Sequence, residues 1–317
     1  MTVERKLTIR EAYSEASSFL EKHRVMEAAN CAQLLLEHVL GVSRSELLLK
    51  WREMFPVEHW REWNNLLERK AAGEPVQYII GEQEFYGLPF TVSPAVLIPR
   101  PETELLVEQV VETGRLLWPQ ACGSAQTQSG GAAGEEAEQG KETAPLIADI
   151  GAGSGAIAVS LAVLCPKWRL LSSDISPAAL TVAKANAERH GVSGRIGFFE
   201  GDLLQPYIDR ALPLDAVVSN PPYIPDADEE GLQPEVRLFE PRSALYGGAD
   251  GLVLYRRLIA QLPELPRMPS LVGLEVGQGQ ADAVAGLLRE AAEWDEVRII
   301  PDLAGIDRHV VAVKHTS

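Results

Sequence analysis

The pattern of apolar and polar residues divides the chain into two regions with different periodicities. Up to about residue 75 the apolar residues follow a helical spacing, as in Cys31, Leu34, Leu35 and Val39, which predicts a bundle of amphipathic helices. From Leu146 onward, short apolar runs alternate with helical segments, which predicts a doubly wound α/β domain. We expect strands at residues 146–150, 168–173, 196–200, 214–219, 270–275, 297–301 and 309–313, and helices near 156–164, 177–190, 252–262 and 280–292.

The end of the chain departs from a plain dinucleotide-binding arrangement. Only residues 302–308 separate the last two predicted strands, and this is too short for a helical crossover between parallel strands. A hairpin that inserts an antiparallel strand is therefore expected. The predicted fold class is α/β, a Rossmann-like seven-stranded sheet with an antiparallel final strand, preceded by a small N-terminal helical bundle.

The helical bundle is predicted to form a domain of its own, residues 1–75. Thr8-Ile9-Arg10-Glu11 has the spacing of a capping box and opens a helix that runs to about His23. Further helices are expected at about residues 27–40, 45–51 and 57–72, the first of these three ending at Gly41. No catalytic constellation occurs in this region, so we interpret it as a recognition or lid module.

Two further parts complete the predicted organisation. Residues 76–100 form a β-hairpin linker, with strands at 76–81 and 84–92. Residues 101–317 form the α/β domain, which begins with a helix from Thr103 to about Leu117. Within it, residues 119–145 are low in complexity and rich in Gly, Ala, Gln and Glu, so we expect a disordered insertion there.

Composition limits the classes of function. Hydrophobic residues make up 46% of the chain and charged residues 23%, as in soluble globular proteins. A formal net charge of −16 argues against a broad contact with nucleic-acid phosphates. No apolar stretch is long enough to span a bilayer. Cys31, Cys122 and Cys165 form no CxxC pair, and the six histidines lack metal-ligand spacing. We therefore expect a reduced, cytoplasmic, metal-free protein. We also expect a monomer.

A glycine-rich turn follows the first strand of the α/β domain, in the sequence Asp149-Ile150-Gly151-Ala152-Gly153-Ser154-Gly155. Its small residues let the backbone approach a ligand closely and let the next helix start tightly against the sheet. The following strand ends in Asp174, 19 residues after Gly155, where a carboxylate can accept hydrogen bonds from two ribose hydroxyls. The turn alone also fits a nicotinamide-dependent oxidoreductase.

A third strand end carries Asp202 and Leu203. Asp202 can accept a hydrogen bond from an adenine amino group, and Leu203 can pack against the ring. For Asp202, a role as helix cap or turn residue fits equally well.

The most informative stretch is Asn220-Pro221-Pro222-Tyr223, directly after the apolar run at 214–219. Ligands of open α/β sheets bind at the carboxyl ends of strands. Two prolines fix two φ angles and remove two backbone donors, so the corner is rigid and extended. The Asn220 amide oxygen and the Pro221 carbonyl can then hold both N–H bonds of a planar –NH2 group, with the face of Tyr223 against the substrate.

These motifs together resemble the class I S-adenosylmethionine-dependent methyltransferases. More closely, the chain resembles the release factor glutamine methyltransferases of the PrmC/HemK family over nearly all its length except residues 119–145. The resemblance rests on the glycine turn, the Asn-Pro-Pro-Tyr corner and the segments at 74–90, 98–104, 240–251 and 275–280, among them Ile98-Pro99-Arg100-Pro101-Glu102-Thr103-Glu104 and Glu275-Val276-Gly277.

The resemblance implies methylation of the glutamine side-chain amide nitrogen (N5) in the Gly-Gly-Gln motif of peptide chain release factors. It implies S-adenosyl-L-methionine as cofactor, a release factor as protein partner, and no direct contact with nucleic acid. The cofactor would contact Asp149, Gly151, Ala152, Gly153, Ser154, Gly155, Asp174, Asp202, Leu203 and Asn220. The glutamine would contact Asn220, Pro221, Pro222 and Tyr223, with Asn220, Pro221 and Tyr223 as catalytic residues. We add Arg100 to the substrate-binding candidates, because the helix that follows does not require it.

Three other functions remain open at this point. A DNA adenine-N6 methyltransferase would use the same corner, since adenine also offers a planar –NH2 group, but the acidic balance and the lack of a basic target-reading region count against it. An oxidoreductase would leave the corner without a role. A non-enzymatic binding module would leave both motifs unexplained.

Overall fold

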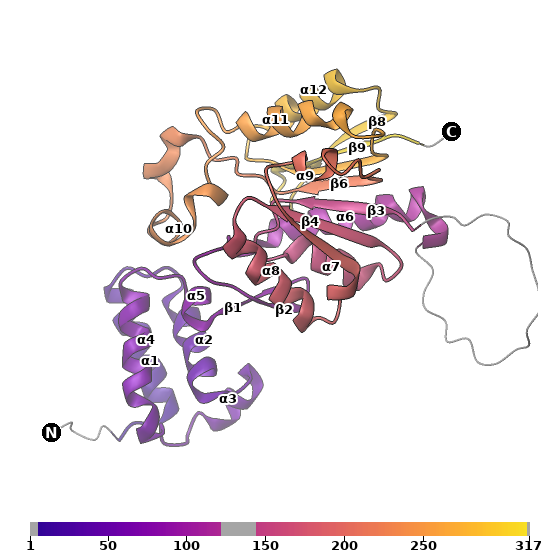
Figure 1. Ribbon diagram of the computed structural model, residues 1–317. Helices are drawn as coiled ribbons and strands as arrows, with labels where there is room; N and C mark the ends of the chain where they lie inside the picture. Colours follow the sequence, from indigo (N-terminus) through magenta and orange to yellow (C-terminus); the bar gives the residue numbers. More distant parts are fainter. Residues whose placement is uncertain (1–5, 122–143, 316–317) are drawn as a thin grey trace, which may run out of the picture. The chain divides into compact units, whose positions relative to one another are not determined.

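The computed structural model describes residues 6–121 and 144–315, which form two compact units (Figure 1). One unit comprises the described residues up to Glu82, together with Val92–Pro94 and Leu232–Glu240. The other comprises Gln83–Thr91, Ala95–Gly231 and the chain from Pro241 onward. Within the described ranges, no helix is both long enough and apolar enough to cross a membrane.

The first unit is a bundle of helices, as the apolar spacing predicts. Its helices are α1 (Ile9–Lys22), α2 (Ala28–Leu40), α3 (Arg44–Lys50), α4 (Trp60–Ala71, after a 3-10 turn at Val57–His59) and α5 (Val76–Ile80). The capping box is present: the Thr8 N–H donates to Glu11 Oε2 at 2.7 Å, and the Glu11 N–H donates to Thr8 Oγ1 at 3.2 Å. Helix α2 ends at Gly41 in the left-handed conformation.

The strand predicted at residues 76–81 is wrong, because this segment is the helix α5. Val76 and Ile79 are one helical turn apart, and both are buried in the apolar core of the bundle. This packing prevails over the β-propensity of the sequence. Gly81, with φ at 83°, ends the helix, and the hairpin that follows is limited to β1 (Glu82–Phe85) and β2 (Leu88–Thr91).

A distant segment completes the helical unit. Helix α10 (Pro234–Phe239) lies in the part of the chain that follows the Asn-Pro-Pro-Tyr corner, yet it clusters with the bundle. Lys70 of α4 is 1% exposed, and its Nζ contacts Glu235 Oε1 at 2.5 Å and the Glu74 carbonyl at 3.1 Å. A buried lysine requires such a partner, so this ion pair attaches α10 to the bundle.

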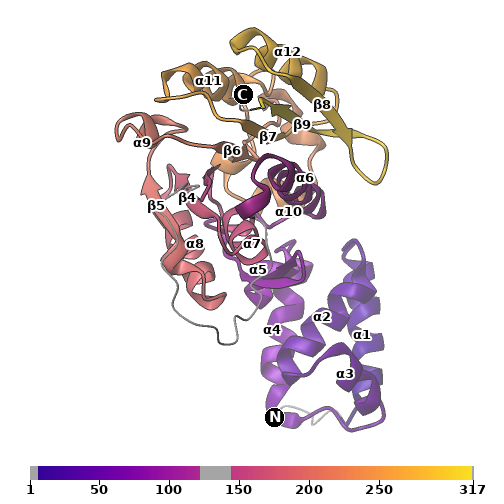
Figure 2. The ribbon, with the colours of Figure 1, turned by 90° about the vertical axis from the view of Figure 1, so that its right-hand side faces the viewer.

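The second unit is built on a seven-stranded sheet (Figure 2). Its strands lie in the order β5-β4-β3-β6-β7-β9-β8. The strands are β3 (Leu146–Ile150), β4 (Arg169–Asp174), β5 (Ile196–Glu200), β6 (Ala216–Ser219), β7 (Leu271–Glu275), β8 (Glu296–Pro301) and β9 (Asp307–Val313). Strand β9 is antiparallel to both β7 and β8, so the predicted hairpin insertion is confirmed.

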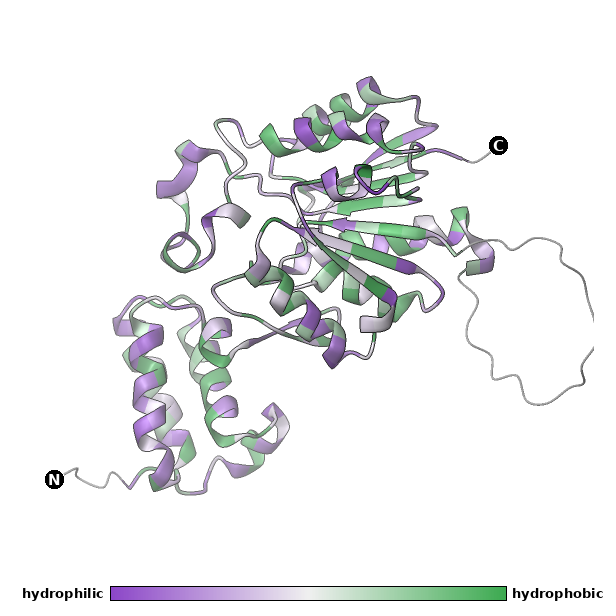
Figure 3. Ribbon diagram, in the orientation of Figure 1, coloured by the Kyte–Doolittle hydropathy of each residue, from purple (hydrophilic) through white to green (hydrophobic). Residues whose placement is uncertain are grey.

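Helices cover both faces of the sheet. One face packs against α6 (Pro101–Leu117), α7 (Ala156–Leu164) and α8 (Pro177–Arg189), and the other against α9 (Gln205–Ile208), α11 (Val253–Gln261) and α12 (Ala281–Ala291). Adjacent residues of each central strand point to opposite faces: Ile147 joins the first core, whereas Ala148 joins the second. Figure 3 shows the central strands as largely apolar, as expected for strands that are buried on both faces of the sheet.

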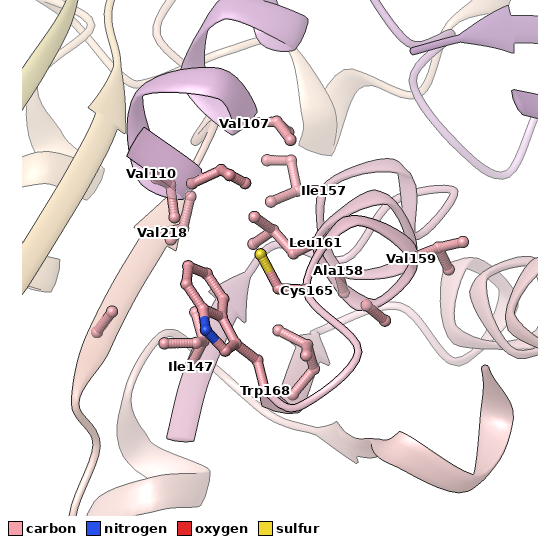
Figure 4. Close-up of a cluster of buried hydrophobic side chains, with 14 of the residues drawn as sticks. Val107, Val110, Ile147, Ile157, Ala158, Val159, Leu161, Cys165, Trp168 and Val218 are labelled. Carbon is pink, nitrogen blue, oxygen red and sulfur yellow. The ribbon is translucent and has the colours of Figure 1, made fainter. Parts of the chain in front are cut away.

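The first core lies between α6, α7 and the sheet (Figure 4). Val107 and Val110 come from α6, Leu161 from α7, and Val218 from β6. Trp168 is fully buried beside them. This packing anchors the start of α6 and the end of β6, which both contribute to the site described below.

The predicted insertion at 119–145 is ordered at its ends. Pro119–Ala121 form a 3-10 turn, and Ala121 packs against the first core. The Pro145 carbonyl accepts a hydrogen bond from the Arg169 N–H at 3.1 Å. Residues 122–143 lie outside the described residues.

Candidate active site

The site lies where the order of the strands in the sheet reverses. The chain proceeds outward from β3 through β4 to β5, then returns to place β6 on the other side of β3. Ligands of such sheets bind at this point, beyond the carboxyl ends of the strands. Ile150 pairs with Ser219, and Ser219 Oγ donates to the Ile150 carbonyl at 2.6 Å. The glycine turn and the Asn-Pro-Pro-Tyr corner therefore start side by side.

A cavity opens between these two motifs. Its empty space, counted together with the open mouth, is about 1090 Å³. Of the predicted site residues, the following line it: Arg100, Gly151, Ala152, Gly153, Ser154, Asp174, Asp202, Leu203, Asn220, Pro221 and Pro222. Asp149, Gly155 and Tyr223 do not line it.

The glycine turn has the conformation that its sequence predicts. Gly151, Gly153 and Gly155 all have positive φ angles, of 83°, 51° and 81°, where residues with a side chain are strained. A Cβ at Gly155 would lie 3.1 Å from the Cβ of Ala183, so this glycine lets α7 start tightly against α8. At Gly151 and Gly153 a Cβ would meet nothing within 4 Å, because these two glycines face open space.

The Asp174 carboxylate is held by two backbone donors. The Gly153 N–H donates to Oδ2, and the Ser176 N–H donates to Oδ1, both at 2.9 Å. These bonds fix the plane of the carboxylate at the rim of the glycine turn. Each oxygen retains a further acceptor position, so Asp174 can still accept from two hydroxyl groups of a ligand.

Apolar and acidic side chains form another part of the cavity wall. Ile175 lines the cavity and is 57% exposed, and Leu203 lines it at a positive φ of 49°. Asp202 also lines the cavity, and it forms an ion pair with Arg257.

The corner is fixed from both sides. Asn220 Nδ2 donates to Thr103 Oγ1 at 3.1 Å, and Thr103 Oγ1 donates to Glu275 Oε2 at 2.6 Å. The Tyr223 carbonyl accepts from Gln280 Nε2 at 2.9 Å. Ile224 pairs with Tyr246 in an isolated bridge. The backbone that carries Pro221 and Pro222, which both line the cavity, is therefore held rigidly.

The ring of Tyr223 is largely buried rather than part of the cavity wall. The ring is close to Gly277, where an added Cβ would be 3.0 Å from a ring carbon. Burial, together with the charge of Glu275, raises the pKa of the Tyr223 hydroxyl to about 12. The substrate role of Tyr223 stays a prediction.

Asp149 is fully buried beneath the glycine turn. Its Oδ2 accepts from Ser172 Oγ at 3.0 Å, and burial raises the pKa of the carboxyl group to about 8. In this position Asp149 supports the turn from below.

Several residues of the site were not predicted from sequence, among them Ile175, Thr103 and Glu275. Ile175 could have been found from sequence, because it directly follows Asp174, the predicted ribose-binding residue. Thr103 and Glu275 lie in segments on which the family resemblance rests. Taken alone, however, Thr103 fits an ordinary first turn of a helix and Glu275 an ordinary strand end, so neither was assigned to the site. Among the residues that the structure describes, no group of three or more His, Cys, Asp or Glu side chains is arranged to hold a metal ion.

Comparison with protein families gives two matches. Residues 11–81 match the PrmC N-terminal domain, and residues 138–239 match the methyltransferase small domain.

Similar proteins extend over nearly the whole chain. A release factor glutamine methyltransferase of Moorella thermoacetica is 42% identical over 309 residues, which cover 97% of this chain and 99% of the relative. Another of Bacillus anthracis is 39% identical over 96% of this chain and 99% of the relative. Among solved structures, the hMettl16 catalytic domain in complex with MAT2A 3′UTR hairpin 6 has a TM-score of 0.53 at 16% identity, covering 80% of this chain and 83% of that chain. That likeness shows the fold alone.

Proposed function

Because the chain belongs to the family of release factor glutamine methyltransferases, we propose that it methylates the glutamine side-chain amide nitrogen (N5) in the Gly-Gly-Gln loop of peptide chain release factors. S-adenosylmethionine is the methyl donor in this proposal. The observation that carries it is the Asn-Pro-Pro-Tyr corner, whose Asn220, Pro221 and Pro222 line one cavity together with the glycine turn.

The residues of the cavity fit S-adenosylmethionine. The cofactor supplies an electrophilic methyl group on a sulfonium. Gly151 and Gly153 offer an open backbone surface to it, and Asp174 offers a preoriented carboxylate to its ribose hydroxyls. Ile175 and Leu203 offer apolar contacts to its adenine ring.

The corner would position the glutamine amide. An amide nitrogen is a poor nucleophile, because its lone pair is conjugated with the carbonyl group. The Asn220 amide oxygen and the Pro221 carbonyl each accept one N–H of the glutamine. Both N–H bonds are then held away from the direction in which the methyl group arrives, and the nitrogen can become pyramidal as the new bond forms. Positioning of this kind lowers a barrier by up to ~7–11 kcal/mol.

No general base is required before methyl transfer. The nitrogen is cationic once it has acquired the methyl group, so its proton is then acidic and is lost to solvent. The catalytic contribution of the chain is therefore the geometry of the acceptors at Asn220 and Pro221.

The helical domain predicted at residues 1–75 is proposed to select the release factor. A single glutamine side chain carries too little information to distinguish one protein from others. Release factors act in translation, so we place the reaction in the cytoplasm. All proposed site residues come from one chain, and the monomer stays a prediction.

The proposal is tested by following methyl groups from labelled S-adenosylmethionine into a purified release factor. A factor whose loop glutamine is replaced by asparagine is the matched control, and duplex DNA is the alternative acceptor. We expect incorporation only into the unmodified factor. Label in DNA and none in the factor would establish the adenine alternative instead.

Asn220 variants test the role of the corner. Asn220→Ala removes one acceptor, and loss of one positioned polar group typically costs about 10²–10³ in rate. Single-turnover rates at saturating cofactor should fall by that factor, whereas affinity for S-adenosylhomocysteine should change much less, because Asp174 and the glycine turn remain. A rate close to that of the wild type would make the corner purely structural.

A truncated chain tests the helical domain. A chain that begins at Gln83, and so lacks the bundle together with α5, should still bind S-adenosylhomocysteine but should methylate the intact factor poorly. Efficient methylation by a stable truncated chain would exclude the recognition role.

A further inference from the structure

The proposed role of Asn220 depends on which end of its side-chain amide faces the substrate. The oxygen accepts hydrogen bonds, whereas the –NH2 group only donates them. If the amide were turned by 180°, the –NH2 group would meet the substrate –NH2 group and repel it. Some other part of the protein must therefore fix this orientation.

A chain of three side chains leads from the interior to Asn220. Glu275 stands at the end of β7, Thr103 in the first turn of α6, and Asn220 directly after β6. Glu275 is 1% exposed and Thr103 is 5% exposed. The bonds run from Asn220 Nδ2 to Thr103 Oγ1 at 3.1 Å and from Thr103 Oγ1 to Glu275 Oε2 at 2.6 Å.

The chemistry of these groups fixes the direction of every bond. An ionised carboxylate can only accept, so the single hydroxyl proton of Thr103 points to Glu275. The oxygen of Thr103 is then left as an acceptor, and it must be approached by the donor end of Asn220. The –NH2 group of Asn220 therefore points to Thr103, and it also acts directly on the Glu275 carboxylate, where its hydrogen bonding lowers the pKa. No described residue donates a hydrogen bond to its Oδ1.

We propose that Thr103 and Glu275 are positioning residues, which set the Asn220 amide so that its oxygen accepts an N–H of the substrate –NH2 group. This inference rests on the proposed function, because it concerns the same acceptor. It adds two residues that do not contact the reacting atoms.

We call the hydrogen-bonded chain from Glu275 through Thr103 to Asn220 the relay. The direction of its hydrogen bonds can reverse when Glu275 is protonated. A protonated carboxyl group can donate to Thr103, whose hydroxyl can then donate to the Asn220 oxygen and turn the amide. Burial raises the pKa of Glu275 to about 7, so the reversal falls within the pH range in which activity can be assayed. The groups that face Glu275 are Glu102 and Thr103 on α6, Arg308 and His309 on β9, Tyr223 and Asn220 at the corner, and Tyr255 on α11, whose hydroxyl donates to the Glu275 backbone carbonyl.

The first test compares Thr103→Val with Thr103→Ser. Valine keeps the shape of threonine but lacks the hydroxyl, whereas serine keeps the hydroxyl. We expect Thr103→Val to lower the single-turnover rate of methyl transfer by roughly 10- to 100-fold, because a group that positions the substrate loses its orientation. The Kd for S-adenosylhomocysteine should stay within about twofold of the wild type. Thr103→Ser should recover most of the rate.

Thr113→Val is the matched control. Thr113 lies on the same helix, is also buried and does not line the cavity, and its Oγ1 accepts from Arg298 at 2.8 Å. This variant should lose stability but keep its rate. A wild-type rate in Thr103→Val, or an equal loss of rate in Thr113→Val, would overturn the proposal.

The second test is the pH profile of Glu275→Gln. In the wild type the rate should fall as the pH decreases through about 7, because protonation removes the carboxylate that orients Thr103. Glutamine does not titrate, so the variant should lose this acidic limb. An unchanged acidic limb in Glu275→Gln would refute the relay even if Thr103→Val fails to fold.

A third measurement separates this inference from the proposed function. The side-chain amide protons of Asn220, observed by ¹⁵N NMR, should have the shift and slow exchange of a hydrogen-bonded –NH2 group, and both should be lost in Thr103→Val. This signature requires no methyl acceptor. Wild-type protein that does not methylate a release factor would refute the proposed function, whereas Asn220 protons insensitive to Thr103→Val would refute the relay.

Discussion

Replacement of Asp174 gives the most direct test of the cofactor site. In Asp174→Ala the carboxylate that faces the cavity is lost, and with it the proposed bonds to two ribose hydroxyls. A hydrogen bond to a charged group contributes ~1.5–3 kcal/mol, which corresponds to roughly a 10- to 150-fold change in affinity for each bond. The Gly153 and Ser176 N–H groups also lose their acceptor. We therefore expect the Kd for S-adenosylhomocysteine to rise by about 100-fold or more.

Asp174→Asn should be almost as damaging, for a reason particular to this structure. Backbone N–H groups approach both carboxylate oxygens, at 2.9 Å each. Whichever way an asparagine amide is turned, its –NH2 group faces one of these donors. If Asp174 only bound ribose, asparagine would instead keep one acceptor and a large part of the affinity.

Isothermal titration with S-adenosylhomocysteine measures these affinities. Asp282→Ala is a suitable control, because Asp282 is an exposed acid in the first turn of α12 and does not line the cavity. It removes the same charge and should leave the Kd unchanged. A Kd for Asp174→Ala within twofold of the wild type would refute the ribose assignment.

Two further predictions concern stability. Burial raises the pKa of Asp149 to about 8 and that of Glu275 to about 7. The folded protein then holds protons that the unfolded chain releases, so stability should fall as the pH rises from about 5 to 8. When Asp149→Asn is unfolded with urea across this pH range, its free energy of unfolding should change less steeply with pH than that of the wild type. An unchanged slope would exclude Asp149 as the source of the pH dependence. In the helical unit, Lys70→Met removes the ion-pair partner of Glu235, which should destabilise the protein by about 1–3 kcal/mol. Lys22→Met, on an exposed side chain of α1, is the comparison, and equal urea midpoints for the two variants would contradict this estimate.

The centre of the sheet could be predicted from sequence because its strands are buried on both faces. Such strands appear as continuous apolar runs, and β3 (Leu146–Ile150), buried at every position, has the predicted bounds. The glycine turn could be predicted because three left-handed backbone conformations require glycine. In both cases the local sequence contains the physical cause.

The features that sequence reasoning missed depend on distant partners. Val76–Ile80 is helical because of the core on which it packs, and this core includes residues from the start of the chain. Lys70 is buried because Glu235, 165 residues away, pairs with it. Thr103 and Glu275 are separated by 172 residues, so their link appears only after the sheet has been assembled.

The choice of target protein requires more than the corner. An amide and an adenine both present a planar –NH2 group, and two acceptors at Asn220 and Pro221 hold either one equally well. The relay through Thr103 and Glu275 sharpens the orientation of the acceptor, but it is insensitive to what carries the –NH2 group. Selection must therefore arise from surfaces that contact the rest of the target. A net charge of −16 disfavours a phosphate backbone as that target, whereas it presents no such obstacle to a protein.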